Sequence, residues 1–303
     1  MSNDPLKSWS DGVTKSAILN FVSRVTREGT PDFVPPAKRI AAFDNDGTLW
    51  PEQPNYIQFV FAFDRVKALV PEHQEWRTRQ PFQAVLEGNV KALVALDERG
   101  LREIITATHS GMTTDQFNAI VADWLATTKD RRFKRFYTEL VYQPMLELLA
   151  YLRTNGFKNF IVSGAGQDFI RVFADKTYCV PPEQVVGSTT ATQFQVQNLR
   201  PGVEPVEDGP GKPVAINRFI GQRPIFAFGN SDGDKEMLEW TAAGVGLRFM
   251  GIVHHTDADR EWAYDRKSDV GRLDKVLDEA NAKGWTVVDM KRDWNVVFPT
   301  EAP

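Results

Sequence analysis

Short, wholly apolar runs alternate with amphipathic segments over most of the chain. Residues 40–43 read Ile-Ala-Ala-Phe and end in Asp-Asn-Asp-Gly, a pattern typical of a strand buried on both faces of a parallel sheet. The same criteria predict strands at residues 157–162, 185–187, 194–196, 224–228, 245–249 and 286–288. Helices are predicted at residues 13–29, at residues 144–154, from Asp168 onwards and at residues 213–221. This alternation predicts an α/β fold built on a parallel sheet.

Residues 56–141 depart from the alternation. Helix-like stretches cover residues 56–70, 82–98, 113–127 and 130–141, and we identify no alternating strand pattern between them. The region therefore reads as an all-helical unit of about four helices, inserted after the first strand of the sheet. A basic run at residues 129–135 is interpreted as the solvated side of an amphipathic helix; in the alternative, one of its arginines reaches an anionic substrate.

Two carboxylates follow the first predicted strand directly. Asp44 and Asp46 are two residues apart, so in extended backbone they point to the same side, at the end where parallel sheets bind ligands. Gly47 permits the turn that follows, and Thr48 can bond backbone groups within it. Such a pair can divide the work of nucleophile and general acid/base. The alternative is a solvated Asp-Asn-Asp-Gly turn.

Polar residues also follow two later strands. Ser163 and Gly164 end the strand at 157–162 and precede a helix, an arrangement that offers a hydroxyl and backbone amides to a phosphate. Lys212 precedes a short helix and can supply a positive charge, while Asn230 and Asp234 offer oxygen ligands to a hard cation. Taken singly, each has a simpler explanation as a helix cap, a solvated lysine or a turn. Their order and their positions at strand ends favour a shared site.

Four motifs in this order resemble the phosphatases of the haloacid dehalogenase superfamily. They are the segments Phe43–Thr48, Val162–Gly164, Lys212 and Gly229–Asp234. The helical insertion is similar to the C1 cap of the phosphoserine-phosphatase-like branch. The resemblance implies a Rossmann-like parallel sheet core at residues 1–54 and 142–303, and an inserted all-helical cap domain at residues 55–141.

The resemblance also implies a mechanism and a cofactor. It makes Asp44 the nucleophile that forms an aspartyl-phosphate, and Asp46 the general acid/base. It assigns phosphate binding to Ser163, Gly164, Lys212 and Thr48, and Mg²⁺ binding to Asp44, Asp46, Asn230 and Asp234. The implied activity is that of a Mg²⁺-dependent phosphatase for a small phosphorylated metabolite. The alternatives are a phosphotransferase and a non-catalytic protein that binds a phosphorylated ligand.

The chain departs from the family pattern at two positions. Asn230 stands where the family usually has a metal-binding Asp, so Asp232 is an alternative ligand. The position aligned with the glutamate that contacts the substrate ammonium in phosphoserine phosphatases is Gln53, with Glu52 beside it.

Composition and charge narrow the class of protein further. The chain has 303 residues, of which 42% are hydrophobic and 25% charged, so it can bury a sizeable core. A net charge of −4 argues against a general binder of nucleic acid or of an anionic membrane. No segment has the apolar length of a membrane span or a signal peptide, and the single cysteine, Cys179, forms no intramolecular disulfide. We therefore expect a cytoplasmic protein; nothing in the pattern predicts an oligomeric state.

Several other residues have simpler interpretations. Residues 254–259 contain two histidines and two aspartates, but Thr-x-x-Asp within them resembles a capping box and favours a helix start. His109 is expected in a loop of the cap. Cys179 is interpreted as a small buried apolar residue.

Overall fold

The computed structural model describes residues 4–88, 98–189, 192–195, 198–201 and 208–300. Six parallel strands form its central sheet, in the order β3-β2-β1-β6-β7-β8. Their bounds are Ile40–Phe43 for β1, Lys158–Gly166 for β2, Val185–Ser188 for β3, Phe226–Gly229 for β6, Phe249–His254 for β7 and Thr286–Asp289 for β8. The chain runs outward from β1 to β3 on one side and from β6 to β8 on the other. The order therefore reverses between β1 and β6, the place where such sheets form a ligand crevice.

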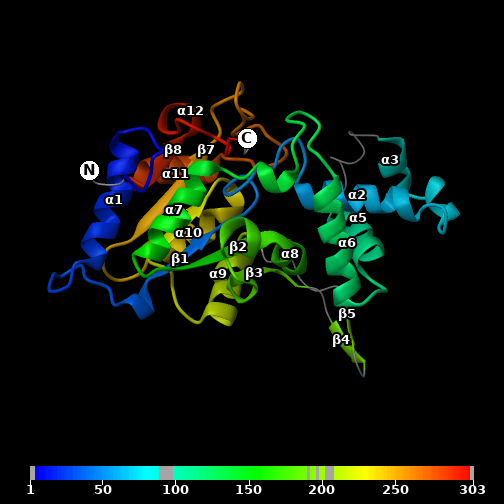
Figure 1. Ribbon diagram of the computed structural model, residues 1–303, viewed down its shortest axis with the longest axis horizontal. Helices are drawn as coiled ribbons and strands as arrows, with labels where there is room; N and C mark the ends of the chain where they lie inside the picture. Colours follow the sequence, from blue (N-terminus) through cyan, green and yellow to red (C-terminus); the bar gives the residue numbers. More distant parts are fainter. Residues whose placement is uncertain (1–3, 89–97, 190–191, 196–197, 202–207, 301–303) are drawn as a thin grey trace.

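Helices cover both faces of the sheet (Figure 1). They are α1 Val13–Thr26, α7 Gln143–Thr154, α8 Gln167–Tyr178, α9 Gly211–Ala215 with a π-helical turn Ile216–Ile220, α10 Lys235–Ala242, α11 Lys275–Lys283 and α12 Met290–Asp293. Alternate residues of β1 face opposite layers: Ala41 and Phe43 pack in the cluster that includes α1 and α7, whereas Ile40 and Ala42 pack with α9 and α10. The α/β Rossmann-like fold is thus confirmed.

The inserted cap consists of helices and stands to one side of the sheet in Figure 1. Its helices are α2 Ile57–Leu69, α3 Phe82–Glu87, α5 Glu98–His109 and α6 Thr114–Thr127, with short 3₁₀ turns at Gln74–Arg77 and Tyr137–Glu139. Near its lower edge lies an antiparallel hairpin of β4 Thr192–Gln195 and β5 Asn198–Pro201. The domain boundaries at 54/55 and 141/142 stay a prediction.

Three expected cap elements differ from the structure. The predicted helix at 82–98 ends at Glu87, because Gly88 adopts a left-handed conformation with φ 64°; residues 89–97 lie outside the described part. The predicted helix at 130–141 is a loop with one 3₁₀ turn, in which Lys134 has φ 58°. Conversely, α5 was not predicted, and His109 is its last residue rather than a loop residue.

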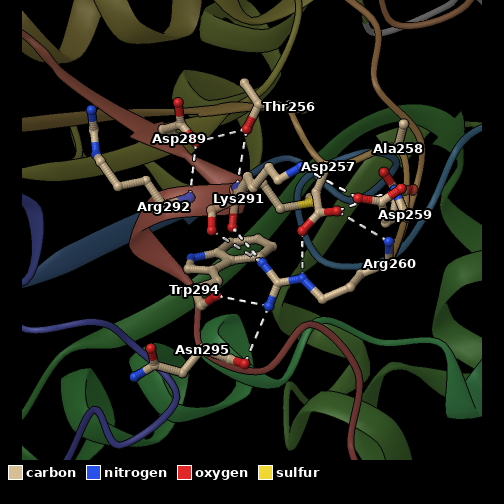
Figure 2. Close-up of polar contacts among 12 residues, drawn as sticks. Thr256, Asp257, Ala258, Asp259, Arg260, Asp289, Lys291, Arg292, Trp294 and Asn295 are labelled. Atoms are coloured by element: carbon tan, nitrogen blue, oxygen red, sulfur yellow. Dashed lines mark hydrogen bonds and ion pairs between the residues drawn. The ribbon is translucent and has the colours of Figure 1, made fainter.

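Two expected elements outside the cap also differ from the structure. The strand expected at 245–249 begins only at Phe249, because Val245 is 94% exposed and Gly246 has φ 84°. No helix begins after Thr256: the Asp257 carboxylate instead accepts bonds from the amides of Asp259 and Arg260 and pairs with the Arg260 guanidinium. Figure 2 shows this guanidinium reaching the backbone carbonyls of Trp294 and Asn295, so the loop is tied to the C-terminal segment.

Cys179 is exposed rather than buried, in a left-handed turn at the end of α8. Among the described residues, no helix combines the length and the apolar character that a membrane span requires.

Candidate active site

The ends of β1 and β6 bring the first and fourth motifs together. Asp44 follows β1 and its backbone amide donates to Phe228 O at 2.9 Å, which continues the pairing of the two strands. Asn230 follows β6, and Thr48 Oγ donates to its side-chain oxygen at 3.0 Å although the two residues are 182 positions apart. The reversal of strand order therefore builds the site, as expected for a sheet of this topology.

Lys212 lies between two buried carboxylates. Its Nζ is 2.6 Å from Asp44 Oδ1 and 2.6 Å from Asp234 Oδ1, and its side chain is only 2% exposed. Burial alone lowers the pKa of Lys212, but the charges of Asp234 and Asp44 outweigh burial and raise it, so the lysine is cationic. Burial and the charge of Asp234 raise the pKa of Asp44 well above its usual range, and Lys212 offsets this in part.

Asp234 uses both carboxylate oxygens within the protein. Its Oδ1 accepts a hydrogen bond from Lys212 Nζ, and its Oδ2 accepts the backbone amides of Asn230 at 2.9 Å and Ser231 at 3.0 Å. It therefore fixes the lysine and the loop after β6; a role of Asp234 as a metal ligand stays a prediction. The Asp232 carboxylate points elsewhere, since it accepts the amides of Asp274 and Val276 at the start of α11.

Asp46 is buried close to Asp44. Trp50 Nε1 donates to its Oδ1 at 2.8 Å, and burial raises the pKa of Asp46 to about 6. A carboxyl group with that pKa can give and take a proton near neutral pH. The side chain is thus suited to acid/base work.

Asn230 is held by two side chains of the loop that follows β1. Its oxygen accepts from Thr48, and its Nδ2 donates to Glu52 Oε1 at 2.6 Å; the hydroxyl of Tyr264 donates to the same Glu52 oxygen at 2.7 Å. Gly47 has φ 74°, and a Cβ there would come within 2.1 Å of Asn230 Nδ2, so this position requires glycine. Thr48 is fully buried and its hydroxyl bonds to Asn230; its contact with phosphate stays a prediction.

The second motif supplies Ser163 and Gly164 to the same place. Ser163 Oγ accepts the amide of Ala165 at 3.1 Å, so its hydroxyl hydrogen can be donated to a ligand. The amide of Gly166 donates to Gln58 Oε1 of the cap at 2.7 Å. This amide therefore links the sheet to the cap.

These groups open into one cavity of about 440 Å³ between the sheet and the cap. We call the sheet end, formed by Asp44, Asp46, Ser163, Gly164 and Lys212, the floor. We call a second part of the lining the cap wall; it is formed by Phe59, Leu101, Ile105, His109 and Phe117 of the cap together with Phe169 of α8. The floor thus unites the predicted catalytic pair with three of the predicted phosphate ligands.

Several lining residues were missed by the sequence analysis. Glu52, rather than Gln53, faces the cavity; the Gln53 amide donates instead to Ser268 Oγ and Val270 O, both at 2.9 Å. Gln58 Nε2 and His109 Nε2 are 3.2 Å apart across 51 residues. Such contacts have no local signal, because only the packing of α2 against α5 creates them.

His255 supports the first motif from behind. Its Nε2 is 2.8 Å from Gly47 O and its Nδ1 is 3.0 Å from Glu261 Oε2, and the pair is almost fully buried. Both ring nitrogens thus face oxygen acceptors, and the contact fixes the turn that carries Asp46. Sequence reasoning had set this histidine aside.

Comparison with known proteins agrees with this geometry. The model of the haloacid dehalogenase-like hydrolase family matches residues 41–239, and the chain belongs to this family. A conserved functionally unknown protein from Anaerococcus prevotii has a similar structure, with 16% identity, a TM-score of 0.59 and 91% of each chain covered.

A protein of unknown function from Bordetella pertussis is also similar, with 15% identity, a TM-score of 0.52 and coverage of 84% of this chain and 99% of that one. A phosphoserine phosphohydrolase-like protein from Francisella tularensis reaches 14% identity and a TM-score of 0.43, over 84% of this chain and 95% of that one. No curated protein matches the sequence.

Proposed function

We propose that this hydrolase is a Mg²⁺-dependent phosphatase that acts on a small phosphorylated metabolite through an aspartyl-phosphate at Asp44. The observation that carries the proposal is the buried trio of Asp44, Lys212 and Asp234 at the floor of the cavity, with Asp46 beside it. Phosphoryl transfer requires positioning and charge neutralisation, and this trio supplies both.

Each step uses a residue of the floor. The Asp44 carboxylate attacks phosphorus, and the bond from phosphorus to the ester oxygen breaks. Asp46 gives its proton to the departing oxygen. It then takes a proton from water, which attacks the aspartyl-phosphate and releases phosphate and the Asp44 carboxylate. Ser163 and Lys212 hold the phosphoryl oxygens throughout.

The donor set fits a divalent cation. Four buried carboxyl groups, those of Asp44, Asp46, Glu52 and Asp234, surround one buried lysine, so negative charge is in excess. In the described residues no group of three or more acidic, His or Cys side chains is placed to hold a metal ion, so a Mg²⁺ ion here would need carbonyl and amide oxygens and retained waters as further ligands. The Asp44 carboxylate, the Asp46 carbonyl and the Asn230 side-chain oxygen would hold the ion. When bound, it would neutralise charge on the transferring phosphoryl group.

The first test measures phosphate release from phenyl phosphate by the purified protein, with Mg²⁺ and with EDTA. We expect turnover that EDTA abolishes and that Asp44→Asn removes, because an amide cannot attack phosphorus. Asp232→Asn is the matched control: it changes a fourth-motif carboxylate that is bound to α11, and Asn still accepts those amides.

Turnover of Asp44→Asn close to that of the unmodified protein would exclude Asp44 as nucleophile. Phosphate transfer to added alcohols in place of release would favour a phosphotransferase. Binding of phosphate esters without turnover would favour a binding protein.

A further inference from the structure

The cap wall has a different chemistry from the floor. Five apolar side chains line it: Phe59 of α2, Leu101 and Ile105 of α5, Phe117 of α6 and Phe169 of α8. They line the same cavity as the phosphoryl-binding groups. A bound phosphate ester would therefore place its alcohol portion against an apolar surface.

The spacing of residues on α5 explains this wall. Leu101, Ile105 and His109 are four residues apart and share one helix face, which lines the cavity. Ile104, one residue away, is instead 1% exposed and packs inside the cap with Trp76 and Phe82. Ile105 also packs against the edge of this cluster, but of the two adjacent isoleucines it is the one that lines the cavity.

The polar groups within the cap wall are neutral. His109 bonds to Thr108 Oγ at 2.7 Å and to Gln58 at 3.2 Å, and burial lowers the pKa of His109 to about 3. Gln58 in turn accepts the amide of Gly166. This chain of contacts provides no positive charge for an anionic substituent.

The charged lining residues are mainly acidic. Five carboxyl groups line the cavity, those of Asp44, Asp46, Glu52, Asp168 and Asp208. The basic side chains in the described lining are Lys212, which is bound to Asp44 and Asp234, and Arg102, whose side chain is exposed to solvent. A second anionic group on the substrate would therefore meet carboxylates without a buried cation to bind it.

We infer that the substrates are monophosphate esters of largely apolar alcohols, alkyl or aryl, that carry no second anionic group. The inference rests on the proposed phosphatase function. The floor holds the phosphoryl group, and the cap wall selects the alcohol by burying its hydrocarbon portion.

The test uses a series of n-alkyl phosphates from methyl to hexyl, with phosphoserine and glycerol phosphate as polar substrates of comparable size. We expect kcat/KM to rise by about fourfold for each added methylene until the cavity is filled. The polar substrates should fall at least tenfold below the alkyl phosphate of matching size. A flat or falling series, or a preference for phosphoserine, would overturn the inference.

A pair of variants on α5 locates the effect. Ile105→Ala should lower the ratio of kcat/KM for hexyl over methyl phosphate by about tenfold, because it removes apolar atoms from the cap wall. Ile104→Ala is the matched control: it removes the same atoms from the interior of the cap, so it should lower the melting temperature and leave the ratio unchanged. If both variants changed the ratio equally, the cap wall would not be the selecting surface.

A binding measurement separates this inference from the proposed function. The matching n-alkyl phosphonates cannot be hydrolysed, and their affinities can be measured by calorimetry. A fourfold gain per methylene with no phosphate release from any ester would support the apolar site and contradict the phosphatase. Phosphate release from phenyl phosphate with phosphonate affinities independent of chain length would support the phosphatase and contradict the apolar site.

Discussion

On the floor of the cavity, charged side chains are fixed by short contacts to one another and to the ends of strands. Lys212 is 2.6 Å from both Asp44 and Asp234, and Asp234 also binds two backbone amides after β6. None of these groups can move without breaking a buried ionic contact. Such a rigid, charged arrangement serves the transferring group, which is the same in every phosphate ester.

The cap wall is built from helices and apolar side chains. Its shape depends on packing between α2, α5 and α6, and the bond from Gly166 to Gln58 ties it to the sheet. Under the proposed function, the floor binds the transferring phosphoryl group and the cap wall contacts the alcohol portion of the substrate. A change on the floor should affect every substrate, whereas a change in the cap should affect selectivity or stability.

Replacing Lys212 by Met should have the largest effect. The substitution leaves Asp44 and Asp234 as two buried carboxylates without their cation, which costs about 3–5 kcal/mol of stability for a broken buried pair. Turnover should be lost for alkyl and aryl substrates alike. Urea unfolding and phosphate release measure the two consequences.

The control for this variant is Lys235→Met, at the first residue of α10, directly after the fourth motif. Lys235 pairs with Glu239 and Glu279 at 3.0 and 3.4 Å and is 28% exposed. Pairs of this kind contribute about 0–1 kcal/mol. Equal stability of the two variants would show that the floor does not depend on the buried lysine.

Asp46→Asn should have the next largest effect, on rate rather than on stability. Loss of a general acid/base costs about 10²–10⁴ in turnover. The loss should be greater for alkyl phosphates than for phenyl phosphate, because a phenolate leaves more easily without a proton. Trp50 can still donate to the amide oxygen of Asn, so the fold should persist. An identical loss for both leaving groups would exclude the acid role of Asp46.

The sequence predicts the floor well for a physical reason. Asp44 and Asp46 follow β1, Ser163 and Gly164 lie near the carboxyl end of β2, and Lys212 lies at the start of α9. Local pattern and parallel topology together therefore place the residues at the strand ends. Local pattern does not show which partner each of these side chains binds. The Thr48 hydroxyl binds Asn230, Asp234 holds Lys212, and the carboxylate in the cavity is that of Glu52 rather than the amide of its neighbour.

The cap is harder to predict because its structure depends on contacts between helices. Helix α5 was missed, and residues 130–141 have helical composition but adopt a loop held by an Asp130–Arg135 backbone bond. The contact between Gln58 and His109 joins residues 51 positions apart. No spacing rule along the chain brings such residues together.

The smallest predicted effect concerns His109 and the pH dependence of stability. Burial lowers the pKa of His109 to about 3 in the folded protein, against about 6.5 when unfolded. The unfolded chain therefore binds a proton below pH 6.5 that the folded chain does not. Stability from this group is present above pH 6.5 and is lost as the pH falls, by about 1.4 kcal/mol per pH unit until about pH 3.

Between pH 7 and pH 5 this loss of stability amounts to about 2 kcal/mol. Over the same range, the free energy of unfolding of His109→Gln, measured in urea, should therefore fall by about 2 kcal/mol less than that of the unmodified protein. His73→Gln is the control for the substitution itself, since it replaces a histidine whose side chain is 43% exposed on the cap surface. The relative turnover of phenyl phosphate at pH 7 by the two variants tests whether the floor and the cap wall have separate functions. If His109→Gln kept the full loss of stability and instead abolished turnover, the histidine would serve the chemistry of the floor and not the packing of the cap.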